Sequence, residues 1–244
     1  MTSTPVLPDG WTLVAFDSVG STNDEAARLA EAGAPEGTFV WAREQTGGRG
    51  RRGRRWASPV GNLYCSTILR PDCPAPRAAE LGFVAALAVA DLVIDGRAVR
   101  VKWPNDVLVN GGKVAGILPE SSIAQDGRVE HVVLGIGVNV GFAPSLPEMR
   151  YPGATLGGTV EAAAAGLAAG LARWLGAWRR EGFETIRANW LERAGPLGAE
   201  VDVKLGEELV RGAFAGMDRE GALMLDTPAG PRRIVSGELL GRAA

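Results

Sequence analysis

The sequence predicts an α+β fold in which a mixed domain, residues 1–195, precedes a small β-domain, residues 196–244. Helix-like and strand-like segments alternate up to Arg193, and Gly195-Pro196 then interrupts the pattern. Only short alternating runs follow. The length of 244 residues suits one large domain with a small one, and a hydrophobic content of 46% excludes a disordered chain.

The expected elements follow in chain order. A strand at 12–16 leads into Ser21-Thr22-Asn23-Asp24-Glu25, which fits a capping box before a helix that ends at Gly33. The later segments of the mixed domain are strands at 38–42 and 62–69, an apolar helix at 75–94, a hairpin of strands 99–103 and 113–118 around a turn at 110–112, a strand at 131–140, and helices at 159–180 and 184–193. Short strands at 201–205, 208–214, 222–225 and 232–235 suggest a small barrel.

The charge and cysteine content exclude several classes of protein. A net charge of −2 argues against a surface that binds nucleic acid as a whole. Cys65 and Cys73 show no disulfide framework, and no cluster of Cys and His that could bind a metal is present. The first ten residues show no secretory signal, and no apolar run is long enough for a bilayer. We therefore expect a cytoplasmic protein without a membrane span.

Only three of the 26 basic residues are lysines, namely Lys102, Lys113 and Lys204. Lysine is a flexible point charge, whereas arginine is a planar fork. In a chain that otherwise uses arginine, a lysine can mark a position that the planar guanidinium would not fill equally well. This bias directs attention to positions 102 and 113.

The segment from Gly47 to Trp56 contains five arginines and four glycines. Glycine lets the backbone approach a ligand, and arginine binds carboxylate or phosphate through two hydrogen bonds. We expect an anion-binding loop that is mobile when empty and ordered by its ligand. The segment is not a P-loop, because no Gly-Lys-Ser/Thr follows. A solvated basic run or a nucleic-acid patch is the alternative.

The segment Lys102-Trp103-Pro104-Asn105-Asp106 is predicted to end a strand, with Asn105 and Asp106 in the connection. There these two side chains could accept hydrogen bonds from a ribose or coordinate Mg²⁺. Lys113, Gly116 and Leu118 are expected on one face of the next strand, where Gly116 leaves room for a ligand beside Lys113. The alternative is an ordinary polar hairpin.

Two further segments have both a structural and a functional interpretation. Gly135-Ile-Gly-Val-Asn139 places glycines inside a strand, which marks close approach either of a ligand or of a packed helix. Ser21-Thr22-Asn23 is a helix cap that becomes functional if its side chains also face a pocket. His131 is interpreted as structural, and Trp174, Trp178 and Trp190 as core residues.

In this order and spacing, these segments closely resemble the motifs of biotin protein ligases. The resemblance covers nearly the whole chain and includes Gly216-Met-Asp-Arg-Glu-Gly-Ala-Leu-Met-Leu225. It implies a mixed sheet similar to class II aminoacyl-tRNA synthetases, followed by an SH3-like barrel. It also implies formation of biotinyl-5′-AMP from biotin and ATP, with Mg²⁺, and transfer of biotin to a lysine of a biotin carboxyl carrier protein. Because Ser21 begins the first motif, we expect the ligase-only form, which binds no DNA. Relatives include dimers, so a homodimer is possible.

The resemblance also assigns roles to residues. Lys113, Arg49 and Arg51 would be catalytic. The biotin site would comprise Ser21, Thr22, Asn23, Gln45, Gly48, Arg49, Gly50, Arg51, Trp56, Lys113, Gly116, Leu118 and Gly135. The ATP site would comprise Arg51, Arg54, Lys102, Asn105, Asp106, Lys113 and Asn139, with Asp106 as a ligand of Mg²⁺. Some relatives cover the adenine with a Trp that this chain lacks, which leaves Tyr151 as a candidate.

Two other functions fit parts of the sequence. A lipoate or octanoate protein ligase shares the fold superfamily, but the Arg–Gly loop followed by Lys-Trp-Pro-Asn-Asp favours biotin. A nucleic-acid-binding module would use the arginine-rich loop as its contact surface. The negative net charge and the single short basic segment argue against that module.

Overall fold

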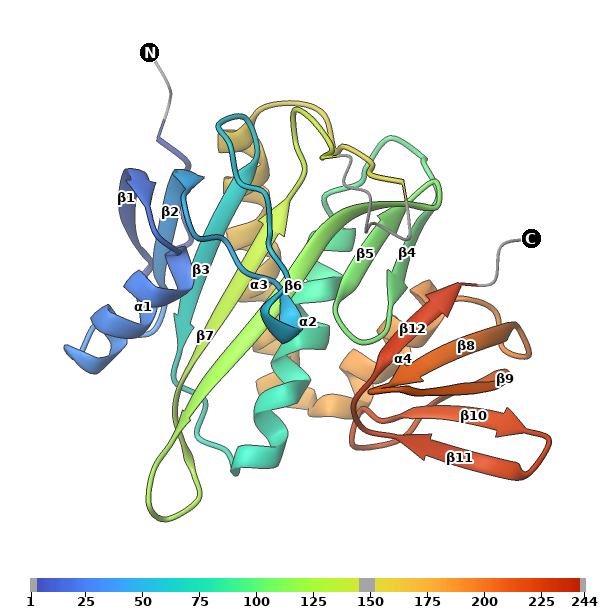
Figure 1. The fold of residues 1–244 in the computed structure, drawn as a ribbon. Helices are drawn as coiled ribbons and strands as arrows, with labels where there is room; N and C mark the ends of the chain where they lie inside the picture. The colour runs from blue at the N-terminus through green and yellow to red at the C-terminus, as the bar shows by residue number, and fades with distance from the viewer. Residues whose placement is uncertain (1–3, 145–151, 242–244) are drawn as a thin grey trace.

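The computed structural model describes residues 4–144 and 152–241, and these form two sheets (Figure 1). The larger sheet has seven strands in the order β1-β2-β3-β7-β6-β5-β4. Its strands are β1 (Thr12–Val19), β2 (Thr38–Gln45), β3 (Leu63–Leu69), β4 (Val99–Lys102), β5 (Asp106–Val109), β6 (Gly112–Ile123) and β7 (Val129–Val138). Strands β1 and β2 are parallel, and the other neighbours are antiparallel.

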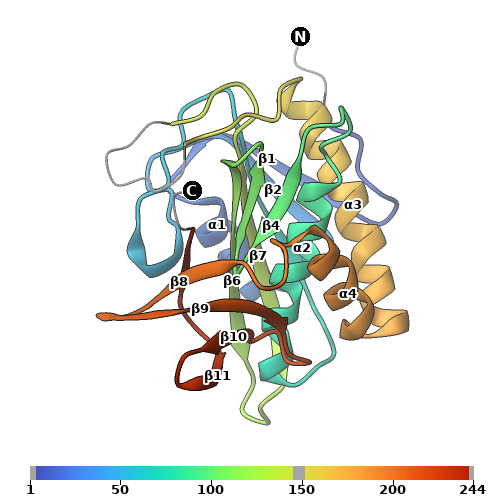
Figure 2. The ribbon, with the colours of Figure 1, turned by 90° about the vertical axis from the view of Figure 1, so that its right-hand side faces the viewer.

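The helices cover the two faces of this sheet unequally. Figure 2 shows α1 (Thr22–Glu31) on one side, and α2 (Glu80–Ala90) and α3 (Val160–Glu181) on the other. All residues of α2 are buried, because the sheet, α3 and α4 (Phe183–Arg193) surround it. A helix that is apolar all round suits such a position. The α1 side keeps more of the sheet open, and the candidate site lies there.

The C-terminal part is a five-stranded antiparallel sheet in the order β11-β10-β9-β8-β12. Its strands are β8 (Glu200–Leu205), β9 (Glu208–Met217), β10 (Leu223–Thr227), β11 (Gly230–Ile234) and β12 (Glu238–Gly241). It packs on the first part through Trp103, whose Nε1 donates to the carbonyl of Gly221 at 3.1 Å, and through α4. The predicted α+β class is confirmed, whereas a domain boundary at residue 195 stays a prediction.

Some predicted elements were wrong in detail. The turn at Asn110 joins β5 to β6, so a four-residue strand lies between the two predicted arms of the hairpin. Asp106 is accordingly the first residue of a strand and not part of a connection. Val107 and Val109 are buried and alternate with less buried residues, as in a strand. The segment 106–109 was not predicted as a strand because it is only four residues long and lies just after Pro104. The expected helix at 75–94 is a 3₁₀ turn, η2 (Ala75–Ala79), followed by the shorter α2. Strand β12 was not predicted.

One extra residue in β6 decides which way Lys113 points. Val107 faces Ala115 across β5 and β6, but the next residue, Leu108, faces Lys113, so Val114 has no partner in β5. This β-bulge shifts the alternation by one residue. Lys113 therefore shares a face with Gly116, as predicted, although strict alternation would have placed the two on opposite faces.

His131 and the helical tryptophans have structural roles, as predicted. His131 is buried in β7, and Trp178 and Trp190 lie in the core, while Trp174 is partly buried and donates to Asp91. Both cysteines are buried and free. No helix within residues 4–144 and 152–241 is long and apolar enough to cross a membrane.

Candidate active site

The floor of the site is a row of facing residues that crosses five strands on the α1 side of the sheet. The row runs through Tyr64, Gly137, Gly116, Asp106 and Lys102. Directly opposed residues of neighbouring strands share a face, so glycines in the middle of the row leave a depression between larger side chains. A second row beside it contains Ser66, Gly135 and Leu118.

Two side chains cover these glycines. A β-carbon at Gly137 would lie 2.5 Å from Trp56 Nε1, and one at Gly116 would lie 3.1 Å from the same ring. A β-carbon at Gly135 would overlap the carboxamide of Asn23. Glycines 116 and 137 therefore admit the indole of Trp56, whereas Gly135 admits the N-terminus of α1.

The polar end of the cavity is built from α1, β2 and β3. The backbone N–H of Thr22 donates to Gln45 Oε1 at 2.8 Å, and Gln45 Nε2 donates to Ser58 Oγ at 3.0 Å. The buried hydroxyl of Ser66 contacts Thr22 Oγ1 at 2.8 Å and Asn23 Oδ1 at 2.6 Å. Thr22, Asn23 and Gln45 thus hold one another and line the cavity. Ser21 is the N-cap of α1 but makes no side-chain cap hydrogen bond, so the predicted capping box is wrong.

A buried carboxylate holds two of the three lysines. Asp106 lies 2.6 Å from Lys113 Nζ and 3.3 Å from Lys102 Nζ. Burial acts to raise the pKa of Asp106, but the two ammonium groups outweigh it and hold the pKa below its usual value. Asp106 thus fixes both ammonium groups at this end of the cavity. Lys113 Nζ also lies 5.3 Å from the Trp56 ring centre.

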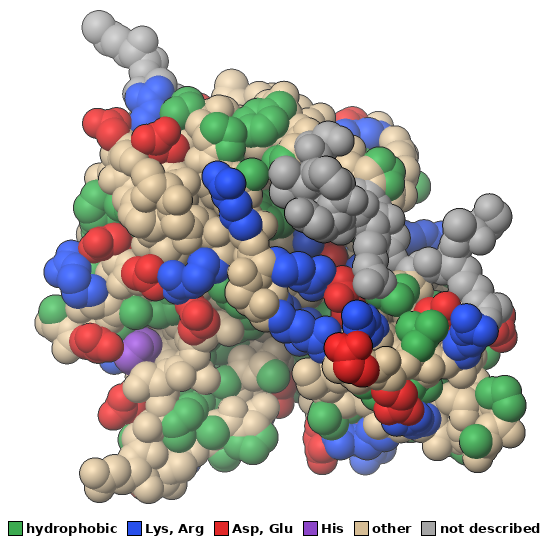
Figure 3. Space-filling model, viewed as in Figure 1, with side chains coloured by type: hydrophobic (Ala, Val, Ile, Leu, Met, Phe, Trp, Pro, Cys, Tyr) green, Lys and Arg blue, Asp and Glu red, His purple; other side chains and the backbone are tan. Residues whose placement is uncertain are grey.

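Three arginines of the loop contact the rest of the protein. Arg49 makes two hydrogen bonds to Asp24 at 2.8 and 2.5 Å, and Arg54 pairs with Glu238 of β12 at 2.7 Å. Arg51 approaches the Asn105 side chain at 3.5 Å. Carboxylates of α1 and of the C-terminal sheet thus face guanidinium groups that were predicted to bind anions. Figure 3 shows basic side chains gathered in the middle of this face.

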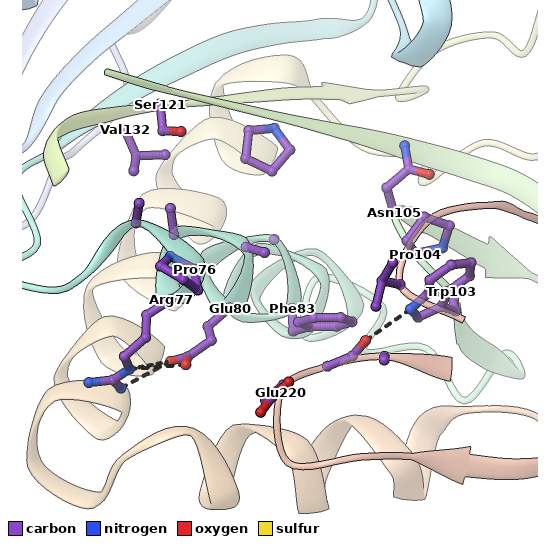
Figure 4. A pocket seen from close by; sticks show the side chains of 18 of the residues that line it. Pro76, Arg77, Glu80, Phe83, Trp103, Pro104, Asn105, Ser121, Val132 and Glu220 are labelled. Atoms are coloured by element: carbon purple, nitrogen blue, oxygen red, sulfur yellow. Dashed lines mark hydrogen bonds and ion pairs between the residues drawn. The ribbon is translucent and has the colours of Figure 1, made fainter. Parts of the chain in front are cut away.

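A larger hollow of about 660 Å³ adjoins the cavity, and the two share Asn105 and Leu118. It runs between η2, the Trp103–Pro104 turn and the C-terminal sheet, as Figure 4 shows. Burial lowers the pKa of Arg51, and the neighbouring Arg52 adds to this. Arg51 therefore stands partly desolvated in the wall of the hollow, beside Asn105.

The cavity brings together most of the predicted biotin residues. Those that line it are Ser21, Thr22, Asn23, Gln45, Arg49, Gly50, Trp56, Lys113, Gly116, Leu118 and Gly135. Gly48 and Arg51 do not line it, although Gly48 lies against Trp56 and Ser58 at the base of the loop.

The predicted ATP residues occupy more varied places. Asn105 lines the cavity, whereas Lys102 and Asp106 lie beneath Lys113 in the sheet. Asn139 is buried, and its side chain donates to the Lys113 carbonyl at 3.1 Å. Tyr151 lies outside the described residues.

Four lining residues were not predicted: Cys65, Ile117, Ile136 and Gly137. Gly137 could have been found, since it lies two residues after Gly135 and therefore on the same face of the strand. The other three are apolar residues with no sequence signal. Ser66 was also missed.

The acidic residues do not fit a resident Mg²⁺. Both oxygens of Asp106 already face lysines. Within the described part of the chain, no group of three or more His, Cys, Asp or Glu side chains could hold a metal ion. Mg²⁺ prefers several oxygen ligands at short distance, and it commonly keeps waters and substrate phosphates among them.

Comparison with known proteins agrees with this geometry. Residues 15–139 match the Biotin/lipoate A/B protein ligase family, and residues 197–239 match the Biotin protein ligase C terminal domain. A biotin–[acetyl-CoA-carboxylase] ligase of Paracoccus denitrificans is 45% identical over 90% of this chain and 96% of its own length. The chain belongs to the biotin protein ligase family. The first family model also includes lipoate ligases. The match to the biotin protein ligase C-terminal domain and the similarity to this relative assign the chain to the biotin protein ligases within that family.

Two further relatives extend the comparison. The bifunctional ligase/repressor of Bacillus subtilis is 34% identical over 94% of this biotin protein ligase and 74% of its own length. The solved biotin protein ligase of Aquifex aeolicus in complex with biotin and ATP is 28% identical, with a TM-score of 0.78 over 93% of this chain and 97% of that one.

Proposed function

We propose that the cavity under Trp56 binds biotin and that biotin reacts there with ATP. We also propose that the adjoining hollow receives the carrier protein. As a biotin protein ligase, the chain forms biotinyl-5′-AMP and then transfers biotin to a lysine of a carboxyl carrier protein. The observation that carries the proposal is that one cavity joins the Thr22–Gln45 cluster to Lys113 across Gly116 and Gly137.

The cavity suits the two ends of biotin. The ureido group both donates and accepts hydrogen bonds, so it belongs with Thr22 and Gln45. The aliphatic tail would lie along the glycine floor beside the indole of Trp56, which brings the carboxylate toward Lys113. This orientation places the reacting atoms at the end of the cavity where the ammonium of Lys113 lies.

The first step brings two anions together. A carboxylate oxygen of biotin attacks the α-phosphorus of ATP, the bond from phosphorus to the bridging oxygen breaks, and pyrophosphate leaves. Lys113 would contact both the carboxylate and the α-phosphate, and its charge stabilises the crowded transition state. Asn139 keeps Lys113 in place through the Lys113 carbonyl. Arg49, Arg51 and Arg54 would exchange their protein partners for the nucleotide.

Mg²⁺ would arrive with ATP as part of the substrate. Because the residues around Asp106 do not fit a resident ion, no catalytic step is assigned to a protein-held metal. The expected role of Asp106 is to hold Lys102 and Lys113 in place. The triphosphate itself supplies the oxygen ligands that Mg²⁺ prefers.

The second step uses the hollow. The amine of the carrier lysine attacks the acyl carbon of biotinyl-5′-AMP, a C–N bond forms, the C–O bond of the anhydride breaks, and AMP leaves as the amine loses a proton. The acyl carbon would lie near Lys113, and the hollow opens beside it at Asn105. This continuity supports the hollow as the route of the carrier lysine.

Biotin-dependent exchange of labelled pyrophosphate into ATP tests the proposal. The purified protein should catalyse exchange with biotin and not with lipoate or octanoate. Exchange with lipoate instead would assign the chain to the other branch of the superfamily. Absence of exchange with all three acids would overturn the proposal.

Several expectations stay predictions. They are that the chain binds no DNA, works in the cytoplasm and divides into domains at residue 195; a homodimer is one possible oligomeric state. Gel-shift assays with DNA, sedimentation and limited proteolysis would address them separately.

A further inference from the structure

Ser66 is a fully buried hydroxyl that the proposed mechanism does not use. It lies in β3, opposite Gly135, and contacts Thr22 and Asn23 at the start of α1. A buried hydroxyl in a strand ordinarily needs a partner only to offset its own desolvation. Ser66 instead contacts two residues of the candidate biotin site.

The neighbouring amides have fixed orientations. Asn23 Nδ2 donates to the Leu118 carbonyl at 3.3 Å and to a carboxylate oxygen of Glu120 at 2.5 Å. Both partners can only accept, so Asn23 must turn Oδ1 toward Ser66. Gln45 is fixed in the same way, because its Oε1 accepts the backbone N–H of Thr22.

Counting protons then assigns the direction of each hydrogen bond. Ser66 has one hydroxyl proton, and Asn23 Oδ1 can only accept, so that proton is committed to Asn23. Ser66 therefore faces Thr22 with a lone pair. The 2.8 Å contact between the two hydroxyls requires Thr22 to donate, in preference to its longer 3.1 Å contact with Gln45 Oε1.

We infer that Ser66 is a positioning residue that fixes the rotation of the Thr22 hydroxyl, so that a lone pair of Oγ1 faces the ligand as a hydrogen-bond acceptor. With its proton committed to Ser66, Thr22 Oγ1 has a lone pair left for an N–H group. Gln45 Nε2, which donates one proton to Ser58, has one N–H left for a carbonyl. An acceptor beside a donor matches the N–H and C=O of a cyclic urea. The inference rests on the proposed function, since it concerns how that site recognises biotin.

Pyrophosphate exchange by Ser66→Ala tests the inference. We expect the KM for biotin to rise by roughly 10-fold, the size of effect associated with one lost buried hydrogen bond, while kcat and the KM for ATP stay within twofold. Desthiobiotin keeps the ureido ring and should show the same rise. Ser66→Cys, which keeps a weak donor, should give an intermediate value and provides a second measurement if the alanine variant folds poorly.

The chain offers a matched control one residue away. Thr67 is equally buried, points to the opposite face, and its hydroxyl has no hydrogen-bond partner among the described residues. Thr67→Val should leave both KM values unchanged. A similar rise in Thr67→Val would show that disturbing β3 is enough, and it would overturn the inference.

A double-mutant cycle separates positioning from a general structural role. If Ser66 acts through Thr22, the Ser66→Ala penalty should fall below twofold in a Thr22→Val background. A penalty of the same size in both backgrounds would overturn the inference. Failure of the proposed function is distinguishable, because the unaltered protein would then show no biotin-dependent exchange at all.

Discussion

The indole of Trp56 lies so close over Gly137 that a β-carbon there would sit 2.5 Å from Nε1. Gly137→Ala should therefore displace the ring from the cavity floor. We expect the KM for biotin in pyrophosphate exchange to rise by about 10-fold or more, because the ring would no longer line the tail. Gly195→Ala is the control, since a β-carbon there meets no atom within 4 Å. An unchanged KM in Gly137→Ala would show that Trp56 does not line the bound tail.

Lys113→Ala should reduce adenylation by more than about 100-fold, because the group that stabilises the two meeting anions is lost. The fold should persist, since Asp106 keeps Lys102 as an ion-pair partner. Pyrophosphate exchange and urea unfolding measure the two effects. The third lysine provides the control, because Lys204→Ala in β8 should leave exchange unaltered. Near-normal exchange by Lys113→Ala would refute the assignment.

Arg51→Ala should release biotinyl-5′-AMP faster by roughly 10-fold, because a desolvated guanidinium that pairs with phosphate is lost. Stopped-flow fluorescence of the preformed complex, diluted into excess biotin, measures the rate. Arg55→Ala is a matched control on the same loop, since Arg55 is exposed and lines neither cavity. Equal rates for both variants and the unaltered protein would contradict the role of Arg51.

Asp106 should make stability depend on acidic pH. Its pKa in the fold lies below the unfolded value of about 3.9, so its contribution is fully present above that value and is lost as the pH falls through the folded pKa. The difference in free energy of unfolding between the unaltered protein and Asp106→Asn should be constant from pH 7 to pH 5 and shrink toward pH 3. A difference that grows on acidification would have the wrong sign for an ion-paired carboxylate.

Val235→Glu should raise the KM for the carrier protein without changing pyrophosphate exchange, if the hollow receives the carrier. Val235 lines the hollow and is 70% exposed, so the change should not disturb folding. Ile94→Glu is a control at an exposed residue that lines neither cavity. Equal carrier kinetics in both variants would exclude this side of the hollow as the route.

The sequence motifs predicted the position of the site because each contains, within a few neighbouring residues, the side chains proposed to bind the ligand. Ser21-Thr22-Asn23, the Arg–Gly loop and Lys113 could each be interpreted alone, and the cavity gathers them. Ser66 could not be found in this way. Its partners are more than 40 residues away in sequence and meet it only after β3, β7 and α1 have packed.

The helices were predicted well where their faces are amphipathic or capped. The expected 159–180 and 184–193 correspond closely to α3 and α4, and Thr159 caps α3 as a side-chain acceptor. Apart from the missed strand β12, the errors in the elements lie mainly between 75 and 110. Prolines interrupt that segment twice, and a four-residue strand has too few positions to display a period.

The bulge at Val114, which has no partner in β5, makes the direction of Lys113 depend on an irregularity of the strand as well as on residue type. Lys113 and Gly116 are three positions apart, so a regular strand would place them on opposite faces. If β6 lost the bulge and Val114 joined the ladder with β5, the ammonium would turn toward α2 and bring an uncompensated charge into the apolar core. Deletion of Val114 would instead leave Lys113 and Gly116 two positions apart, a spacing that keeps both on one face without a bulge.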